Sequence, residues 1–155
     1  MGVDWQFLPF PKLTLDQLYD LLRLREQIFV IEQTCLYGEL DGWEKEAFHL
    51  LGYAPDKTLA AYARIFPPNH VYYGETFPEA RIGRVALHKD WRGKGRGHML
   101  MQESLARVES AFGKTPVILN AQTHLEKFYN AHGFSRAGDI FDEGGIPHIL
   151  MRRPE

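Results

Sequence analysis

Residues 91–98 read Trp-Arg-Gly-Lys-Gly-Arg-Gly-His and separate the two most clearly patterned segments of this 155-residue chain. Residues 80–88 before them predict a buried strand, and apolar residues at helical spacing predict a helix over 96–112 after them. The three glycines let the backbone turn tightly and approach a ligand, and the first N–H groups of a helix attract anions. Three cations, Arg92, Lys94 and Arg96, alternate with the glycines. We therefore expect residues 92–97, the glycine loop, to hold a pyrophosphate group.

Other known glycine motifs do not fit this loop. The P-loop pattern Gly-x-x-x-x-Gly-Lys-Ser/Thr is absent, and Gly93, Gly95 and Gly97 are one residue short of the dinucleotide-binding spacing. Taken alone, the loop is also compatible with a solvent-exposed turn with solubilising charges, because a short glycine motif is a weak signal. The order of the flanking segments is what favours a binding loop.

The composition is that of one globular domain, expected to span residues 1–155. Apolar residues make up 45% and charged residues 25% of the chain, and the net charge of −2 argues against a dedicated nucleic-acid binder. We see no apolar run long enough to cross a membrane and no signal peptide. The lone cysteine, Cys35, cannot form an internal disulfide, which fits a reducing compartment. We expect a cytoplasmic protein with neither a nucleic-acid nor a membrane partner.

The remaining pattern predicts an α/β (α+β) fold, in which helices flank one central mixed sheet. Thr14 and Gln17 form a capping box that starts an amphipathic helix ending near Gln33. No structure is predicted for 66–80. The other expected elements are an edge strand at 3–7, a loop at 36–45, paired strands at 47–53 and 58–65, a strand at 117–121, a helix at 123–131, and strands at 134–141 and 146–152.

The order of these elements, together with two motifs, resembles the GNAT (GCN5-related) N-acetyltransferase superfamily. The motifs are Arg92-x-x-Gly95-x-Gly97 in the glycine loop and Phe128-Tyr129-x-x-x-Gly133-Phe134 at the end of the helix expected at 123–131. Residues 25–33 (Arg-Glu-Gln-Ile-Phe-Val-Ile-Glu-Gln) and 145–151 (Gly-Ile-Pro-His-Ile-Leu-Met) are similar to the ElaA-like subgroup. The resemblance covers nearly the whole chain but does not identify the acyl acceptor.

The resemblance implies acetyl-coenzyme A as co-substrate, bound where the sheet splays between the strands holding 85–87 and 117–121. It implies that backbone groups near Val85 and Leu87 hold the pantetheine arm and that Tyr129 lies near the thioester sulfur. No metal is expected, because no histidine pair has the helical spacing of a zinc site. The expected cofactor contacts are Val85, Leu87, Arg92, Gly93, Lys94, Gly95, Arg96, Gly97, Gln122 and Tyr129.

The implied activity is N-acetyl transfer by direct attack of a primary amine on the thioester, through a tetrahedral intermediate. The departing thiolate needs a proton at neutral pH, and Tyr129 is expected to donate it. The plainer interpretation of Tyr129 is a ring packed in the core. The alternative function, from another class, is a coenzyme A-binding sensor or partner-binding module without catalysis.

The base that takes the proton from the amine is open among five residues. Glu32 ends the first helix and is one choice for the acceptor site, and His148 is the other, although its strand position also fits a core histidine. Glu39 is a further carboxylate candidate, Asp41 is equally suited to an Asx turn, and His49 to a purely structural place in the sheet. Desolvation of the amine, without any base, is the remaining alternative.

Two expectations concern partners. Acidic residues near the first loop, Glu32, Glu39, Asp41 and Glu44, hint at a cationic small-molecule or peptide acceptor, although such a run is also typical of a solvated surface. The strands over 134–152 offer an edge or a face to a second copy of the chain, so a homodimer is possible.

Overall fold

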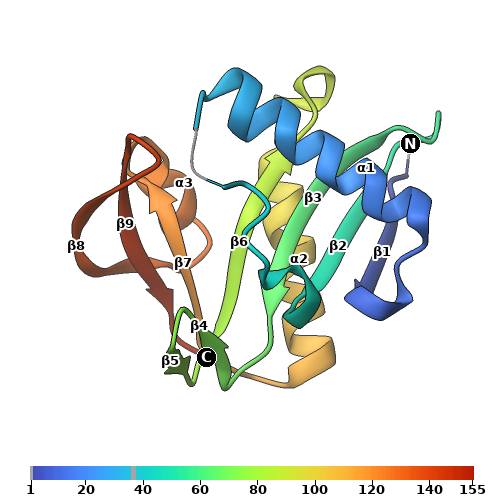
Figure 1. Ribbon diagram of the computed structural model, residues 1–155. Helices are drawn as coiled ribbons and strands as arrows, with labels where there is room; N and C mark the ends of the chain where they lie inside the picture. The colour runs from blue at the N-terminus through green and yellow to red at the C-terminus, as the bar shows by residue number, and fades with distance from the viewer. Residues whose placement is uncertain (1, 36–37) are drawn as a thin grey trace.

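A seven-stranded sheet forms the centre of the computed structural model, which describes residues 2–35 and 38–155 (Figure 1). The strand order is β1-β2-β3-β6-β7-β9-β8, and every neighbouring pair is antiparallel except β6 and β7. The mixed sheet flanked by helices agrees with the predicted fold class. The strands are β1 (Asp4–Pro9), β2 (Phe48–Tyr53), β3 (Leu59–Phe66), β6 (Ala80–Leu87), β7 (Val117–Gln122), β8 (Ser135–Glu143) and β9 (Ile146–Arg153), with β4 (His70–Tyr72) and β5 (Glu75–Phe77) as a separate hairpin.

The helices begin and end close to their predicted limits. The capping box is present: the Thr14 hydroxyl accepts from the Gln17 N–H at 3.0 Å, and the Gln17 side chain accepts from the Thr14 N–H at 2.9 Å. The first helix continues beyond Arg25 as a π-helical segment. The helices are α1 (Leu15–Arg25), η2 (Glu26–Glu32), α2 (Arg96–Phe112) and α3 (Glu126–Asn130), with short 3₁₀ turns η1 (Phe10–Lys12), η3 (Trp43–Glu46), η4 (Lys89–Trp91) and η5 (Thr123–Leu125). Across the described residues, no helix combines the length and the apolar character needed to cross a bilayer.

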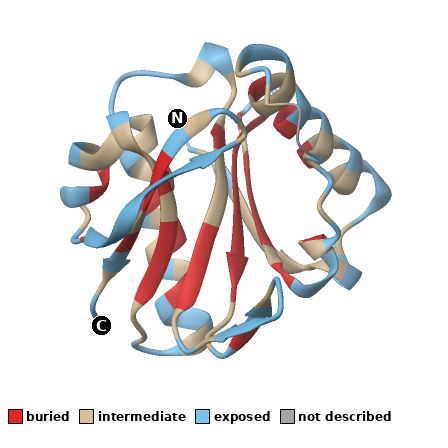
Figure 2. Ribbon diagram, turned by 60° about the vertical axis from the view of Figure 1, so that its left-hand side comes forward, coloured by how far each residue is buried: buried red, intermediate tan, exposed pale blue. Residues whose placement is uncertain are grey.

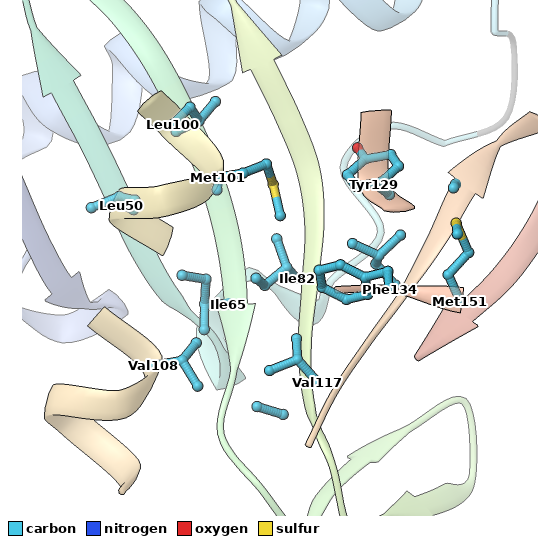
Figure 3. Packing of buried hydrophobic residues seen from close by; sticks show 14 of the residues in the cluster. Leu50, Ile65, Ile82, Leu100, Met101, Val108, Val117, Tyr129, Phe134 and Met151 are labelled. Atoms are coloured by element: carbon cyan, nitrogen blue, oxygen red, sulfur yellow. The ribbon is translucent and has the colours of Figure 1, made fainter. Parts of the chain in front are cut away.

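Two apolar clusters cover the two faces of the sheet. On one face α1 and η2 pack on Leu51, Tyr62 and Ala86, and on the other α2 packs on residues that include Ile65 and Ile82 (Figure 3). Because helices cover both faces, all eight residues of β3 are buried, whereas all nine residues of the edge strand β8 are exposed (Figure 2). The core therefore consists of two layers, one on each face of the central strands.

The sheet opens between β6 and β7. These parallel strands pair only at their first residues, Ala80 with Val117 and Arg81 with Ile118, and then diverge (Figure 1). Tyr62 lies opposite Ala86 and Arg64 opposite Gly83, so two steps along β3 match three along β6, and β6 carries a bulge. Within this bulge Arg84 adopts a φ of 48°, which redirects its side chain and bends the strand. The predicted splay is thus present, and the bulge accompanies it.

One region of the chain has regular structure that the sequence did not predict. The unassigned stretch 66–80 contains the β4–β5 hairpin, whose turn has left-handed backbone at Tyr73 (φ 50°) and Gly74 (φ 80°). Three-residue strands carry too little alternation to be recognised in a sequence. The loop expected at 36–45 includes Leu36 and Tyr37, which lie outside the described residues, and its last part forms the 3₁₀ turn η3.

Candidate functional site

The opening between β6 and β7 forms a cavity of about 910 Å³. Its floor is apolar, with Ile82, Leu100 and Leu119 belonging to the core or packing on it. Seven of the predicted site residues line this cavity. They are Val85, Leu87, Arg92, Gly97, Gln122, Tyr129 and His148.

The glycine loop presents backbone N–H groups at the start of α2. Gly93, Lys94 and Gly95 have φ values of 88°, 58° and 74°, so three successive residues adopt the left-handed conformation. Nothing lies within 4 Å of an ideal Cβ placed on Gly93 or Gly95, so the loop leaves room for a ligand. In the described residues the N–H groups of Gly97 and His98 have no acceptor, as expected for the first turn of a helix. This geometry suits an anion.

The cations of the glycine loop have different surroundings. The Arg92 guanidinium donates to a Glu32 carboxylate oxygen at 2.7 Å and to the Leu87 carbonyl at 3.3 Å. Arg96 stacks on Trp91 with its guanidinium carbon 4.4 Å from the ring centroid, and Lys94 is exposed. The pairing with Arg92 places Glu32 on the surface, and Glu32 is not among the residues that line the cavity. Glu32 thus lies beside the glycine loop and outside the wall of the cavity.

Tyr129 is both a core residue and part of the cavity wall. Its ring packs in the core against Phe128 and Phe134, with centroids 5.0 Å and 6.1 Å away (Figure 3). The side chain is only 7% exposed but lines the cavity, and its hydroxyl has no hydrogen-bond partner in residues 2–35 and 38–155. Burial raises the pKa of Tyr129 to about 12, so the hydroxyl keeps its proton at neutral pH. The site thus holds a protonated donor without a partner.

His148 is buried in the wall formed by β9, opposite Gln122 of β7. Its Nδ1 lies 2.8 Å from the Ile146 carbonyl oxygen, which only accepts, so Nδ1 carries the hydrogen. Nε2 lies 3.4 Å from a Glu143 carboxylate oxygen, which would accept from Nε2 once that nitrogen carries a proton. The part of the chain that the structure describes holds no group of three His, Cys, Asp or Glu side chains suited to a metal ion.

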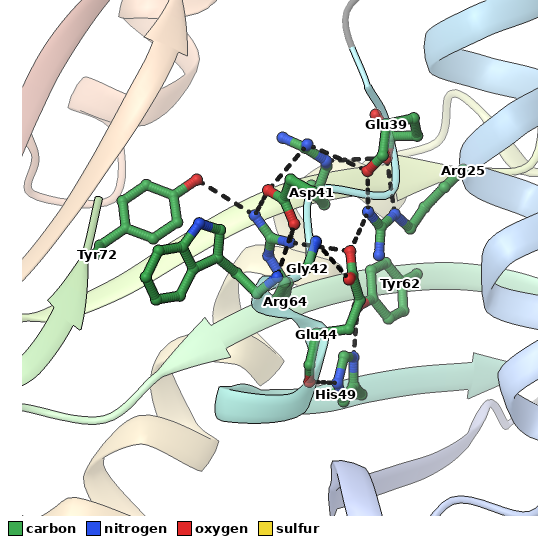
Figure 4. Close-up of polar contacts among 11 residues, drawn as sticks. Arg25, Glu39, Asp41, Gly42, Glu44, His49, Tyr62, Arg64 and Tyr72 are labelled. Carbon is green, nitrogen blue, oxygen red and sulfur yellow. Dashed lines mark hydrogen bonds and ion pairs between the residues drawn. The ribbon is translucent and has the colours of Figure 1, made fainter. Parts of the chain in front are cut away.

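A network of three arginines and three carboxylates, which we call the ion-pair network, anchors the segment 38–46 to the sheet (Figure 4). Its shortest contacts join Arg25 to Glu39 at 2.7 Å, Arg64 to Asp41 at 2.8 Å, and Arg84 to Glu39 at 2.9 Å. Glu44 accepts from Arg25 at 3.0 Å. The network consists of Arg25 from α1, Arg64 from β3, Arg84 from the β6 bulge, and Glu39, Asp41 and Glu44 from the segment.

This network corrects one hint from the sequence. Glu39, Asp41 and Glu44 do not form a solvated surface, because the guanidinium groups of three arginines pair with them and balance their charges. Burial would raise the pKa of Asp41, but the hydrogen bonds and charge of Arg64 outweigh it and hold the pKa at about 2. Asp41 also accepts from the Trp43 N–H at 3.1 Å, which is the expected Asx turn. Such a weakly basic carboxylate is unsuited to accept a proton from an amine.

The surroundings of His49 agree with a purely structural role, which was the alternative to a role as base. It is fully buried, outside the cavity lining, with Nε2 2.9 Å from the Glu44 carbonyl oxygen and Nδ1 2.6 Å from the Tyr62 hydroxyl. The carbonyl must receive the Nε2 hydrogen, so Nδ1 accepts from Tyr62. Burial lowers the pKa of His49 to about 4, and the neutral ring supports the end of the segment 38–46.

The lowered pKa of His49 predicts how the free energy of unfolding depends on pH. Its folded-state pKa of about 4 lies below the ordinary value of 6.5, so the unfolded chain takes up the proton first as the pH falls. Stability should decline from pH 6.5 to about pH 4, by about 3 kcal/mol for this residue alone. In urea titrations at several pH values, the gap in unfolding free energy between wild type and His49→Gln should narrow over this range. A gap that stays constant would contradict the assignment.

Sequence reasoning missed several residues of the cavity wall. Asn120 alternates with Gln122 along β7, a period-two signal that was available in the sequence. Tyr72 and Tyr73 lie in the stretch for which no structure was predicted, and Asp142 and Glu143 lie between the strands predicted at 134–141 and 146–152. Nothing local in the sequence places the β4–β5 and β8–β9 hairpins at the same cavity.

Comparison with known proteins gives a consistent result. A family model described as an acetyltransferase (GNAT) domain matches residues 21–154. The ElaA protein of Escherichia coli K12 is 38% identical over 153 residues, covering 97% of this chain and 96% of that protein, and its crystal structure has a TM-score of 0.85. A UPF0039 protein of Synechocystis is 36% identical over 151 residues, covering 97% and 95%. The crystal structure of an acyl-CoA N-acyltransferase from Pseudomonas aeruginosa has a TM-score of 0.88 at 40% identity, covering 98% of this chain and 99% of that one.

Proposed function

The chain belongs to the GNAT acetyltransferase family, and from this premise we propose that it transfers an acetyl group from acetyl-coenzyme A to a primary amine. The observation that carries the proposal is the cavity that joins the glycine loop, the diverging edge of β6 and the Tyr129 hydroxyl. The free Cys35 fits the reducing cytoplasm in which we place the reaction.

The residues around the cavity suit each part of coenzyme A. The N–H groups at the glycine loop and the first turn of α2 would hold the pyrophosphate. The pantetheine arm has peptide-like groups, and β6 beyond Arg81 has lost its β7 partner, so backbone groups near Val85 and Leu87 would pair with the arm. The thioester would then lie deeper in the cavity, where the walls are apolar. Apolar walls of this kind strengthen polar interactions with the reacting carbonyl.

The chemistry requires one proton to leave nitrogen and one to reach sulfur. A neutral amine attacks the thioester carbonyl carbon, the nitrogen–carbon bond forms, and the carbon–sulfur bond breaks from the tetrahedral intermediate. The Tyr129 hydroxyl gives its proton to the departing sulfur, and His148 Nε2 takes the proton that the nitrogen loses. The products are the amide and the free thiol, and solvent returns the proton from His148 to Tyr129.

The experiment that tests the proposal is thiol release from acetyl-coenzyme A with a panel of primary amines. The amines should accelerate release, and mass spectrometry should find the acetylated amine in equal amount. Tight binding of coenzyme A with no release on any amine would instead favour the non-catalytic binding module.

Gly95→Ala should weaken coenzyme A binding about tenfold, because the left-handed backbone that aims the N–H groups is strained with a Cβ by about 1 to 2 kcal/mol. Gly42 is a matched control: its φ of 85°, its ψ of −5° and its open surroundings resemble those of Gly95 (φ 74°, ψ 13°), but it does not line the cavity. Both variants should lose similar stability, and calorimetry should show weaker binding only for Gly95→Ala. Equal affinities in the two variants would remove the loop from the site.

A further inference from the structure

A hydrogen bond between two glutamines joins two walls of the cavity. The side-chain nitrogen of Gln122, the last residue of β7, donates to the side-chain oxygen of Gln33 at 3.1 Å. The two residues are 89 positions apart along the chain, and both line the cavity. The bond therefore ties the end of the first helix to the strand that diverges from β6.

The π-helical segment η2 holds the backbone of Gln33. The Gln33 N–H donates at 3.1 Å to the carbonyl of Ile28, five residues earlier, so the wide turn continues to the end of the segment. Phe29, four positions before Gln33, also lines the cavity. π-Helical turns are rare and are often found at functional sites. The sequence 25–33, which resembles the ElaA-like subgroup, thus ends in an amide that reaches the cavity.

The bond to Gln33 sets the direction of the Gln122 amide. An amide group has two N–H donors on its nitrogen and an acceptor oxygen on the opposite side. Because the nitrogen is directed at Gln33, the oxygen is directed away from it. In residues 2–35 and 38–155 no group donates a hydrogen bond to this oxygen. The Gln122 oxygen is thus available to accept from an N–H group of a ligand in the cavity.

His148 lies beside Gln122 in the cavity wall. The two residues are directly opposite each other on the antiparallel strands β7 and β9. Side chains at such positions share one face of the sheet, with their Cβ atoms about 5 Å apart. His148 Nε2 is the atom that takes a proton from the attacking nitrogen in the proposed function. The Gln122 oxygen and His148 Nε2 therefore form two neighbouring acceptors, which match the two N–H groups of a primary amine.

We infer that Gln33 is a positioning residue for the acceptor amine and acts through the Gln122 amide. The inference rests on the proposed function. One N–H of the attacking nitrogen donates to His148 Nε2 and the other to the Gln122 oxygen, which leaves the lone pair for the thioester carbonyl carbon. Holding a reactant in its attacking geometry lowers the barrier to reaction. Without Gln33, the Gln122 amide can rotate and turn its own N–H groups toward the amine.

The test is a double-mutant cycle between Gln33 and Gln122, with thiol release at saturating acetyl-coenzyme A as the readout. The probe is the fastest-reacting amine of the panel, which includes n-butylamine as its simplest member. Gln33→Met should lower kcat/KM for the amine about tenfold, the effect of one hydrogen bond. Gln122→Met should lower it at least as much, and the double variant should be no slower than Gln122→Met. Gln33→Glu should recover most of the loss, because a carboxylate only accepts and keeps Gln122 in the same orientation.

Gln102→Met is the matched control, because Gln102 is exposed on α2 and does not line the cavity. It should keep the wild-type kcat/KM. Losses that multiply in the double variant would overturn the inference, since Gln33 would then act independently of Gln122. A wild-type kcat/KM in Gln33→Met, or a loss in this variant that calorimetry traces to coenzyme A affinity, would also overturn it and leave the proposed function standing. Absence of thiol release with every amine would overturn both.

Discussion

Replacing Tyr129 with phenylalanine is expected to lower kcat by about 100- to 1,000-fold, the range typical of a lost general acid. The substitution removes the hydroxyl and keeps the ring that packs against Phe128 and Phe134, so the fold should survive. Because the ordinary thiol pKa of about 8.5 lies above neutral pH, a proton donor to the departing sulfur matters most at or below neutral pH. Steady-state kinetics at neutral pH would measure the loss, and calorimetry should find coenzyme A affinity nearly unchanged.

Tyr53→Phe provides the control for a lost tyrosine hydroxyl. Tyr53 donates to Asp20 at 3.2 Å and does not line the cavity, so its variant should retain wild-type kcat. If Tyr129→Phe behaved like Tyr53→Phe, the sulfur would take its proton from another source, and Tyr129 would be only a core residue.

Replacing Arg25 with methionine should destabilise the protein by about 3 to 5 kcal/mol, the cost of removing one partner from a buried ion pair. Arg25 is fully buried and donates to the Glu39 carboxylate, to the Glu39 carbonyl and to Glu44 at 2.7, 2.7 and 3.0 Å. Without it, both carboxylates keep their charge in a poorly hydrated place, and the segment 38–46 loses its anchor to α1. Urea unfolding and a fall in Tm of about 10 °C would report the change.

Arg107→Met is the matched control for this loss. Arg107 pairs with Glu103 at 2.7 Å one helical turn away on α2, but its side chain is 34% exposed. Exposed pairs of this kind contribute less than about 1 kcal/mol. A loss in Arg25→Met no larger than that in Arg107→Met would show that the network is not a structural anchor. Because Glu39 and Asp41 line the cavity, we also expect Arg25→Met to raise KM for the acceptor.

Features that depend on neighbours within a few residues were predictable from the sequence. Thr14 and Gln17 cap the first helix across three positions, and α2 runs over the predicted 96–112 because its apolar residues repeat every turn. The glycine loop was visible for the same reason, since left-handed backbone at Gly93 and Gly95 selects for glycine locally. The cavity residues Val85, Leu87, Gln122 and Tyr129 followed once these elements were ordered along the chain.

The charged part of the cavity wall was decided by the tertiary structure. Glu39 and Asp41 are joined to Arg84, 45 and 43 positions along the chain, and only the path of the segment 38–46 across the sheet brings them together. Asp142 and Glu143 have the same side-chain chemistry, yet the structure gives them no arginine among the described residues.

The amino-acid sequence by itself thus determined the elements, their order and the loop suited to an acyl carrier, because propensity, capping and periodicity act over one or two turns. The tertiary structure decided which charges are neutralised and which remain, because Coulomb interactions depend on distances in space. The bulge at Arg84 is an example, because it turns a guanidinium toward two carboxylates that are far away in the sequence and so neutralises their charges.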